Sequence, residues 1–324
     1  MRKSGLKFWL VGAALLVSTS ALAQGGLPGT LAWTPNAEAA QIAIAIDKDY
    51  WKQSGVALKT IAFPTGREAL EALLGGQVDF AALAELPAVI GAMRGQKFAV
   101  ITLLTKYRAN RVVLTTALGE PKIAALAGKR IGTTLGTNAH YMTDLVLGKA
   151  NVKAQIVNVA PPDIVAALVR GDIDAAVMFP AFFGPAKRAL GARYAEIMTP
   201  EYNTHFLVAA TLDAIEKRPE VVRSFLAALV KADQLIASDA PGAQAGLVRV
   251  VGGAMTTAQL AASWPDYEFR MSLEPALLAL MRQQGEWIQR AGLIKAVEPT
   301  EALFRTYLRP EPLRAVAPER VTLR

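Results

Sequence analysis

Residues 72–79 read Ala-Leu-Leu-Gly-Gly-Gln-Val-Asp, and residues 167–174 read Ala-Leu-Val-Arg-Gly-Asp-Ile-Asp. Both stretches predict a helix that ends at glycine, a turn at an acid, and entry into a short apolar strand. A proline lies upstream of each, Pro64 in the first case and Pro161-Pro162 in the second. This internal sequence similarity indicates two α/β halves of similar build. A chance match in an alanine-rich chain is the alternative.

The same alternation extends in both directions from these two stretches. Short β-branched runs predict strands at residues 31–33, 56–62, 78–82, 98–104, 112–116, 129–133, 155–159, 175–178 and 195–198. Helices are expected between them, for example at residues 38–54 and from the Thr65-x-x-Glu68 capping pattern to Gly75. Strands separated by helices of this length predict parallel sheets of right-handed βαβ units. After Thr211 we expect helices only, at residues 221–236, 256–263 and 272–291.

The N-terminus has the three parts of a secretory signal peptide. Arg2, Lys3 and Lys7 give a positive start, residues 8–17 are apolar, and Ala21-Leu22-Ala23 forms a small-x-small cleavage site. The apolar run is shorter than the roughly 20 residues of a membrane helix. We therefore expect residues 1–23 to be removed, with an uncleaved anchor as the alternative.

Composition narrows the class of protein further. The chain has no cysteine, which excludes disulfides, thiolate metal sites, a cysteine nucleophile and a lipid-bearing N-terminal cysteine. Removing the three basic residues of the leader lowers Lys+Arg from 35 to 32 against 27 acids, a net charge of +5. Nucleic-acid binding would require a basic run interleaved with aromatic residues, and no such run is present. These features predict a soluble periplasmic protein without a lipid anchor.

The order of several motifs resembles a known family. In the first half they are Trp33-Thr34-Pro35-Asn36 and residues 76–80, and in the middle Leu126 to Gly132 followed by residues 136–140. Residues 205–209 then lead into a helix that contains Pro219-Glu220-Val221-Val222. Together these motifs, over residues 30–237, resemble the ABC-type periplasmic binding proteins for nitrate, taurine, alkanesulfonates and thiamine-pyrimidine precursors.

This resemblance implies an α/β fold of the type II periplasmic binding class, with a central ligand cleft and a helical C-terminal extension. Residues 24–115 and 206–324 would form the first lobe, and residues 116–205 the second. One departure limits the transfer. Many relatives carry a Trp-Glu-Pro-Trp-like segment after the second Gly-Asp-x-Asp turn, whereas residues 178–183 here read Met-Phe-Pro-Ala-Phe-Phe. The ligand therefore cannot be copied from those relatives.

The turn after the strand at residues 129–133 is the first candidate for ligand binding. Thr134, Gly136, Thr137 and Asn138 lie between that strand and a helix whose free N–H groups suit an oxyanion. Their hydroxyl and amide groups add neutral donors for a sulfonate, carboxylate or nitrate. Plain helix capping by Thr137 or Asn138 is the alternative.

Further candidates follow other strands. In the first lobe these are Asn36 and Thr65, which would otherwise be turn and capping residues, and Glu85, which would favour an amine on the ligand or else be a solvated loop acid. Arg67, Arg108 and Arg111 could each clamp an anion, with Arg111 the first to test, although surface salt bridges are the default for all three. Candidate contacts and walls elsewhere are His140, Phe179 and Asn203.

Chemistry other than binding finds little support in the sequence. His140 and His205 lack the closely spaced partners of a metal site, and we expect neither a metal nor a cofactor. Asp79 and Asp174 fit turn structure better than catalysis. The resemblance implies a receptor for an ABC importer, a monomer that contacts permease subunits. Its ligand would be a small anionic or zwitterionic molecule, an aliphatic sulfonate or a taurine-like compound. Alternatives are a thiamine-pyrimidine-precursor, nitrate or bicarbonate binder, an enzyme on the same fold, and a signalling receptor.

Overall fold

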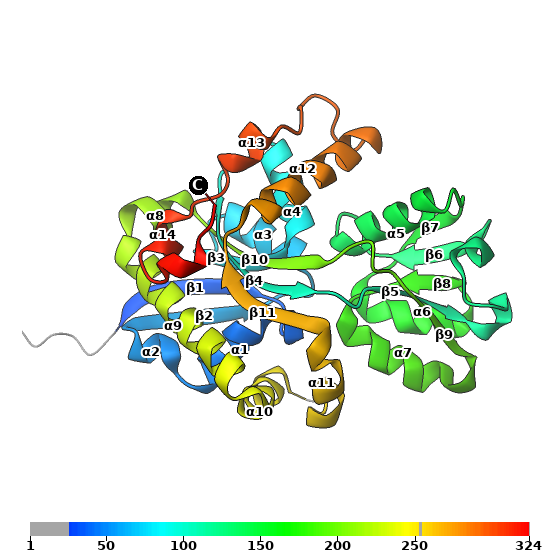
Figure 1. Cartoon of the computed structure of the whole chain (residues 1–324), viewed down its shortest axis with the longest axis horizontal. Helices are drawn as coiled ribbons and strands as arrows, with labels where there is room; N and C mark the ends of the chain where they lie inside the picture. The colour runs from blue at the N-terminus through cyan, green and yellow to red at the C-terminus, as the bar shows by residue number, and fades with distance from the viewer. Residues whose placement is uncertain (1–25, 253–254, 324) are drawn as a thin grey trace, which may run out of the picture.

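The computed structural model describes residues 26–252 and 255–323 and contains two β-sheets (Figure 1). The predicted signal peptide at residues 1–23 lies outside this range. The first sheet has six strands in the order β11-β4-β10-β3-β1-β2, and the second has five in the order β7-β6-β8-β5-β9. In Figure 1 the six-stranded sheet lies on the left with most of the helices, and the five-stranded sheet lies on the right.

The strands occur close to most of the predicted positions. Those of the six-stranded sheet are β1 Leu27–Trp33, β2 Val56–Ala62, β3 Phe80–Ala84, β4 Ala99–Tyr107, β10 Thr204–Ala210 and β11 Tyr267–Ser272. Those of the five-stranded sheet are β5 Arg111–Thr115, β6 Arg130–Thr133, β7 Gln155–Asn158, β8 Ala175–Val177 and β9 Tyr194–Met198. Two expectations were wrong. The region after Thr211 is not helix only, because it contains β11, and both sheets are mixed rather than parallel.

The antiparallel strands arise because the chain passes between the sheets twice. β10 runs antiparallel to β3 and β4, and β5 runs antiparallel to β8 and β9. The crossings join β4 to β5 and β9 to β10, and they contact each other where Thr199 donates from its backbone N–H (2.9 Å) and its hydroxyl (2.8 Å) to the carbonyl of Asn110. This double crossing is the geometry of a hinge between two lobes.

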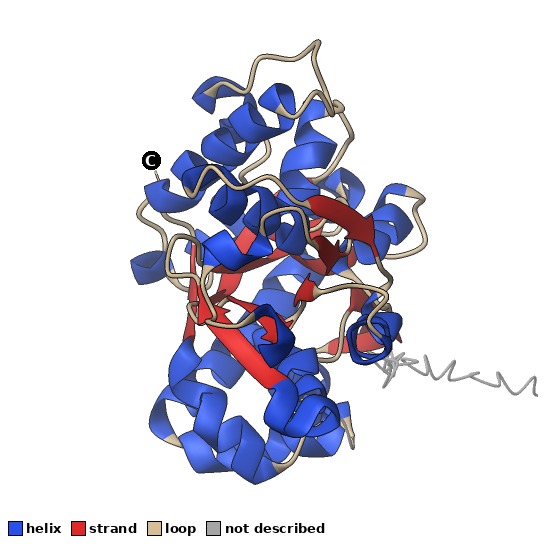
Figure 2. Ribbon diagram, turned by 90° about the vertical axis from the view of Figure 1, so that its right-hand side faces the viewer, coloured by secondary structure: helices blue, strands red, loops and turns tan. Residues whose placement is uncertain are grey.

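Helices cover the faces of both sheets, as Figure 2 shows. Around the six-stranded sheet they are α1 Ala40–Asp47, α2 Tyr50–Gln53, α3 Gly66–Leu74, α4 Glu85–Met93, α8 Leu212–Lys217, α9 Pro219–Ser238, α10 Ala240–Val251, α11 Thr257–Ser263, α12 Pro275–Arg290, α13 Glu301–Arg305 and α14 Glu311–Arg314. Around the five-stranded sheet they are α5 Asn138–Lys149, α6 Ile164–Arg170 and α7 Phe183–Leu190. No helix among the described residues is both long and apolar enough to cross a membrane.

The two similar stretches, residues 72–79 and 167–174, have matching local structures. Gly76 and Gly171 both have positive φ values, 71° and 79°, which glycine adopts without strain. Asp79 then accepts hydrogen bonds from the backbone N–H and the hydroxyl of Thr30, each over 2.9 Å. Asp174 likewise accepts from the backbone N–H of Arg130 over 2.8 Å. Each aspartate therefore ties its turn to the neighbouring strand, which confirms the structural interpretation of both acids.

A large apolar core holds the six-stranded lobe together. Phe80 of β3 stacks on Phe225 of α9 with ring centroids 4.0 Å apart, and Trp51 stacks on the same ring at 5.8 Å. The five-stranded lobe has a smaller separate core around Val113, Ile164 and Leu168. The large core also includes Val112, Ile131 and Val177 of the five-stranded sheet, so one apolar cluster runs through both lobes and the smaller core covers the other face of the five-stranded sheet.

Candidate functional site

A cavity of about 310 Å³ lies between the two sheets. From the six-stranded side it is lined by Thr34, Pro35, Asn36, Glu38, Pro64, Thr65, Gly66, Arg67, Ala84, Pro87 and Phe206, and from the five-stranded side by Thr137, Asn138, Phe179, Ala181, Phe182 and Pro185. Most of these residues follow the carboxyl ends of strands, where open α/β sheets bind ligands. The volume suits a small organic molecule.

Two helices begin at this cavity, one from each lobe. Thr65 is the N-cap of α3, and its Oγ1 accepts a hydrogen bond from the backbone N–H of Glu68 over 3.3 Å. Thr137 is the N-cap of α5, but its hydroxyl donates to the carbonyl of Thr134 over 2.7 Å and does not cap the helix. The first N–H groups of a helix have no partner within the helix and carry partial positive charge. Both lobes therefore present anion-binding groups to the same space.

Arg67 adds a full positive charge close to the N-termini of α3 and α5. It lies in the first turn of α3, and a Cβ placed on Gly136 would be 3.7 Å from Arg67 Cδ. The arginine is thus beside the turn that precedes α5. Its only ion pair among the described residues is with Glu71, at 4.0 Å, so most of its donors are free for a ligand.

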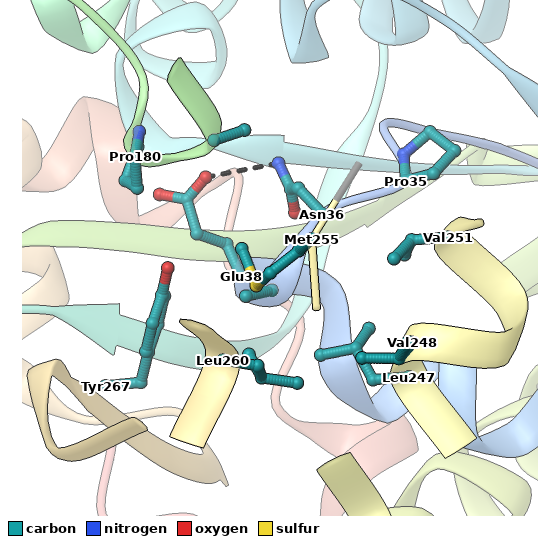
Figure 3. Close-up of a pocket in the computed structure, with 12 residues that line it drawn as sticks. Pro35, Asn36, Glu38, Pro180, Leu247, Val248, Val251, Met255, Leu260 and Tyr267 are labelled. Carbon is teal, nitrogen blue, oxygen red and sulfur yellow. Dashed lines mark hydrogen bonds between the residues drawn. The ribbon is translucent and has the colours of Figure 1, made fainter. Parts of the chain in front are cut away.

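Glu38 supplies an acid to the same cavity. The first strand ends before Asn36, whose Oδ1 accepts from the backbone N–H of Ala39 (3.2 Å) and whose Nδ2 donates to Glu38 Oε2 (3.2 Å; Figure 3). Glu38 is only 6% exposed. Burial, reinforced by the nearby charge of Glu85, raises the pKa of Glu38 to about 8. At neutral pH this carboxyl group is therefore mostly protonated.

Apolar side chains surround Glu38 on the side away from the cavity. They belong to a second pocket of about 20 Å³, room for no more than a water molecule, and include Leu247, Val251, Met255, Leu260 and Tyr267. Figure 3 shows Met255, which precedes α11, and Leu260 of α11 beside the stem of Glu38, whereas its carboxyl group lies near Asn36 and Pro180. The apolar side chains of this second pocket account for the burial that raises the pKa of Glu38.

Two hydroxyl oxygens near the strand ends have no hydrogen-bond partner among the described residues. Thr34 Oγ1 and Thr133 Oγ1 are both buried. Thr34 lines the cavity and follows β1, and Thr133 ends β6 in the other lobe. Buried polar atoms are nearly always paired in folded proteins, so the unpaired hydroxyl of Thr34 beside the cavity points to a ligand or water.

The structure brings five of the predicted site residues to the cavity: Asn36, Thr65, Thr137, Asn138 and Phe179. Arg67, not Arg111, is the arginine that lines it. Arg111 instead lies 3.2 Å from Glu196 and 3.6 Å from Asp266, with its guanidinium over the ring of Phe183. Its charge is neutralised by partners from both lobes, so it serves as a structural link.

The other predicted residues also lie outside the cavity. Glu85 is fully buried beneath it, where it accepts from the Tyr202 hydroxyl, from Gln284 Nε2 (2.6 Å) and from the backbone N–H of His205 (2.9 Å). Burial raises its pKa. The acid that lines the cavity is Glu38, not the predicted Glu85.

Thr134, Gly136, His140 and Asn203 do not line the cavity either. The hydroxyl of Thr134 donates to the carbonyl of Val159 over 2.9 Å, and Gly136 has a φ of 75°. His140 packs edge-on against Trp287, with burial lowering its pKa, and Asn203 is exposed. No cluster of His, Asp and Glu within the described residues is arranged to hold a metal ion.

Glu38 was the main omission of the sequence analysis. The available signal was an acid two positions after Asn36, directly beyond the end of the first strand. What hides it from sequence reasoning is that its burial comes from α10, α11 and β11, more than 200 residues later in the chain.

The family model described as NMT1/THI5 like matches residues 36–242. This chain belongs to the NMT1/THI5-like family. Over 216 residues it is 31% identical to the taurine-binding periplasmic protein of Escherichia coli (strain K12), covering 63% of this chain and 65% of that protein, which is just under two thirds of its length. It is also 24% identical over 230 residues to a putative aliphatic sulfonates-binding protein of the same organism, covering 69% and 71% of the two chains.

Solved structures agree on the fold. The alkanesulfonate-binding protein SsuA from Xanthomonas axonopodis pv. citri, bound to MOPS, superposes with a TM-score of 0.74 at 16% identity over 88% of this chain and 99% of that one. The nitrate-binding protein NrtA from Synechocystis PCC 6803 gives 0.73 at 12% identity over 91% and 89%. A Candida albicans protein described as having the generic periplasmic binding protein fold gives 0.70 at 14% identity over 87% and 96%. This member of the NMT1/THI5-like family thus has the predicted periplasmic binding fold.

Proposed function

We propose that this protein is the periplasmic receptor of an ABC importer and binds a small organic anion, with an aliphatic sulfonate as the first candidate. The observation that carries the proposal is the convergence of the N-termini of α3 and α5, together with Arg67, on one cavity between two sheets. Backbone donors from two lobes suit the several oxygens of a sulfonate, because each lobe can take part of the group.

The rest of the cavity favours an organic group over a bare inorganic ion. Phe179, Phe182, Pro185 and Phe206 form apolar walls, and 310 Å³ is far more than nitrate or bicarbonate fills. The names of the taurine- and sulfonate-binding relatives in Escherichia coli support the same ligand class. A thiamine-pyrimidine precursor is the second candidate, since the aromatic walls could also hold a flat ring.

We also propose binding without turnover. Glu38 and Arg67 are the ionisable side chains among the described residues that line the cavity, and no serine, cysteine, lysine or histidine lines it beside them. In this proposal the lobes, divided near residues 115 and 205, close on the ligand about the double crossing. The closed shape would then be recognised by the permease, with the receptor acting as a monomer.

Thermal unfolding of residues 24–324 with a ligand panel tests this function. The panel contains ethanesulfonate, 2-aminoethanesulfonate, propionate, nitrate, bicarbonate and an aminopyrimidine. A ligand at about 100 times its dissociation constant stabilises the folded state by about 2.7 kcal/mol, and it should be recovered unchanged. A response to nitrate alone, or conversion of the ligand, would refute the proposal.

A further inference from the structure

We propose that a chamber between α7 and α11 is a second binding subsite, in which Arg188 and Gln259 hold a distal acidic group of an elongated ligand. The proposal rests on the proposed function, because the first anionic group of the ligand is placed at the N-termini of α3 and α5. It narrows the ligand class to an organic dianion whose two acidic groups are separated by an apolar chain.

The chamber has a volume of about 430 Å³ and adjoins the 310 Å³ cavity. Ala181 and Pro185 line both spaces, so they mark the place where the two meet. The side chain of Ala181 is a single methyl group, which obstructs this junction less than a larger residue would. Pockets that hold drug-sized ligands measure roughly 300–1,000 Å³, and the two spaces together lie in that range. Ethanesulfonate would occupy the first space alone.

Both lobes contribute to the chamber. Its walls include α7 of the five-stranded lobe and α11 of the six-stranded lobe, which lie opposite each other in Figure 1. Phe183 and Tyr194 line it from the first of these lobes, and Tyr267 lines it from the other. These rings give the chamber an apolar wall against which the chain of a ligand can pack.

Two hydrogen-bond donors converge beside Gly184 at the start of α7. A Cβ placed on Gly184 would lie 3.4 Å from Arg188 Nη1 and 3.8 Å from Gln259 Nε2, so donors from opposite lobes approach one point. The amide of Gln259 is oriented by Thr256, whose backbone N–H (2.9 Å) and hydroxyl (3.2 Å) both donate to Gln259 Oε1. Its Nε2 is therefore the end that faces Arg188.

Neither donor has an acceptor within residues 26–252 and 255–323. The acids of the chamber are already paired, because Glu196 and Asp266 lie 3.2 Å and 3.6 Å from the guanidinium of Arg111. Lys187 adds a further positive charge, and its Nζ lies 5.9 Å from the ring centroid of Tyr194. Two donors and an unbalanced positive charge in one place suit an anionic group.

The gain from this second contact should be moderate and should depend on ligand length. Arg188 is exposed, so water screens its charge and limits what the contact adds. We expect a dianion of suitable length to bind about 5- to 30-fold more tightly than the monoanion of the same length. A short dianion cannot pass the Ala181 junction while its first group stays at α3 and α5, and it should gain nothing.

Isothermal titration calorimetry with two matched ligand series tests the proposal. One series contains 1-alkanesulfonates and the other α,ω-alkanedisulfonates, each with two to ten carbons and at constant ionic strength. The disulfonates should match the monosulfonates at two carbons and exceed them above a threshold length. Raising the salt concentration should reduce this excess, because the distal cation is exposed.

Three variants assign the excess to its residues. Arg188→Gln removes the charge, and Gln259→Glu replaces the donor with an anionic oxygen while it keeps the acceptor of the capping box. We expect both to lower the advantage of the long disulfonates to below about threefold and to bind ethanesulfonate as the wild type does, because neither residue lines the first cavity. Lys149→Gln is the control, since Lys149 is an exposed cation at the end of α5 that lines neither space.

The outcomes separate the two proposals. Disulfonates that bind no more tightly than monosulfonates at every length overturn the second subsite and leave the anion-binding function intact. The same holds if Arg188→Gln and Gln259→Glu keep the full advantage of the long disulfonates, or if Lys149→Gln loses it to the same extent as they do. Failure of the wild type to bind any member of either series overturns the proposed ligand class, and the subsite with it.

Discussion

Asn138 Nδ2 donates a hydrogen bond to Thr204 Oγ1 over 3.1 Å, which joins the first turn of α5 in one lobe to β10 in the other. Thr204 Oγ1 also accepts from Asn110 Nδ2 over 3.2 Å, so both crossing strands meet at this hydroxyl. Asn138 lines the cavity, whereas Thr204 lies behind it. The contact therefore links the turn before α5, which lines the cavity, to the double crossing between the sheets.

Replacing the hydroxyl at this link should destabilise the protein. Thr204→Val removes the acceptor of Asn138 Nδ2 and one of the two hydrogen bonds of Asn110 Nδ2, which keeps its bond to the Tyr202 carbonyl, and we expect a loss of about 1–3 kcal/mol in the free energy of unfolding. Thr204→Ser keeps the oxygen and should lose much less. Denaturant unfolding of both variants without ligand measures the difference, and equal losses would argue against the hydrogen bond as the cause.

The raised pKa of Glu38 in the folded protein should make the free energy of unfolding depend on pH. The folded chain holds its proton up to about pH 8, whereas the unfolded chain releases it near the ordinary glutamate pKa of 4.5. Between these values the folded state binds more protons, so the free energy of unfolding falls as the pH rises. Glu85 acts in the same direction, because burial raises its pKa too.

The contribution of Glu38 is isolated by comparison with Glu38→Gln. We expect this variant to gain stability relative to the wild type as the pH rises from 5 to 8, by up to about 1.4 kcal/mol per pH unit. Urea unfolding of the ligand-free proteins at four pH values measures the gap. Parallel curves for the two proteins would show that Glu38 is not protonated in the folded state.

Thr65 should serve two purposes, as the cap of α3 and as part of the site. Thr65→Ala removes the bond to the Glu68 N–H and should reduce stability by about 1 kcal/mol. Thr300→Ala is the matched control, because Thr300 caps α13 through the Leu303 N–H and does not line the cavity. Similar losses of stability are expected in both, with weaker sulfonate binding in Thr65→Ala alone. Equal affinities would restrict Thr65 to capping.

Arg67 should contribute to affinity through its charge. We expect Arg67→Gln to weaken ethanesulfonate binding by about 5- to 30-fold and to make the remaining affinity less sensitive to salt, since an exposed cation is screened. Its loss of stability should be below about 0.5 kcal/mol. Arg282→Gln is the control, because Arg282 forms a similar surface pair, with Glu286 on α12. Unchanged affinity in Arg67→Gln would leave the anion to backbone donors.

Much of the fold could be read from local patterns. The β-branched runs located β1 to β9 to within a few residues, because strand propensity and turn glycines lie in the same short stretches. β11 was missed although Tyr267, Phe269 and Met271 alternate with polar residues, a period-two pattern that the neighbouring helices obscured. The antiparallel partners of β10 depend on the hinge crossings and have no local signal.

The candidate site was predicted where it depends on strand-to-helix turns. Thr65, Thr137 and Asn138 follow from that rule, as does Asn36 after β1. Glu38 did not follow, and Arg67 could not be told from Arg108 and Arg111, because the positions of both side chains depend on contacts distant in sequence. Arg67 approaches Gly136 of the other lobe, and Glu38 is enclosed by helices near the C-terminus. From its charge alone, Arg111 is as plausible an anion-binding residue as Arg67. Only the structure shows that Arg111 is paired with Glu196 and Asp266.

A crystal structure of residues 24–324 grown with saturating ethanesulfonate tests the central claim most directly. The account predicts the sulfonate between the first turns of α3 and α5, with its oxygens within hydrogen-bond distance of the backbone N–H groups there and of Arg67. Its ethyl group should lie against the walls formed by Phe179 and Phe182. An empty cavity, or a sulfonate bound elsewhere on the molecule, would contradict the account.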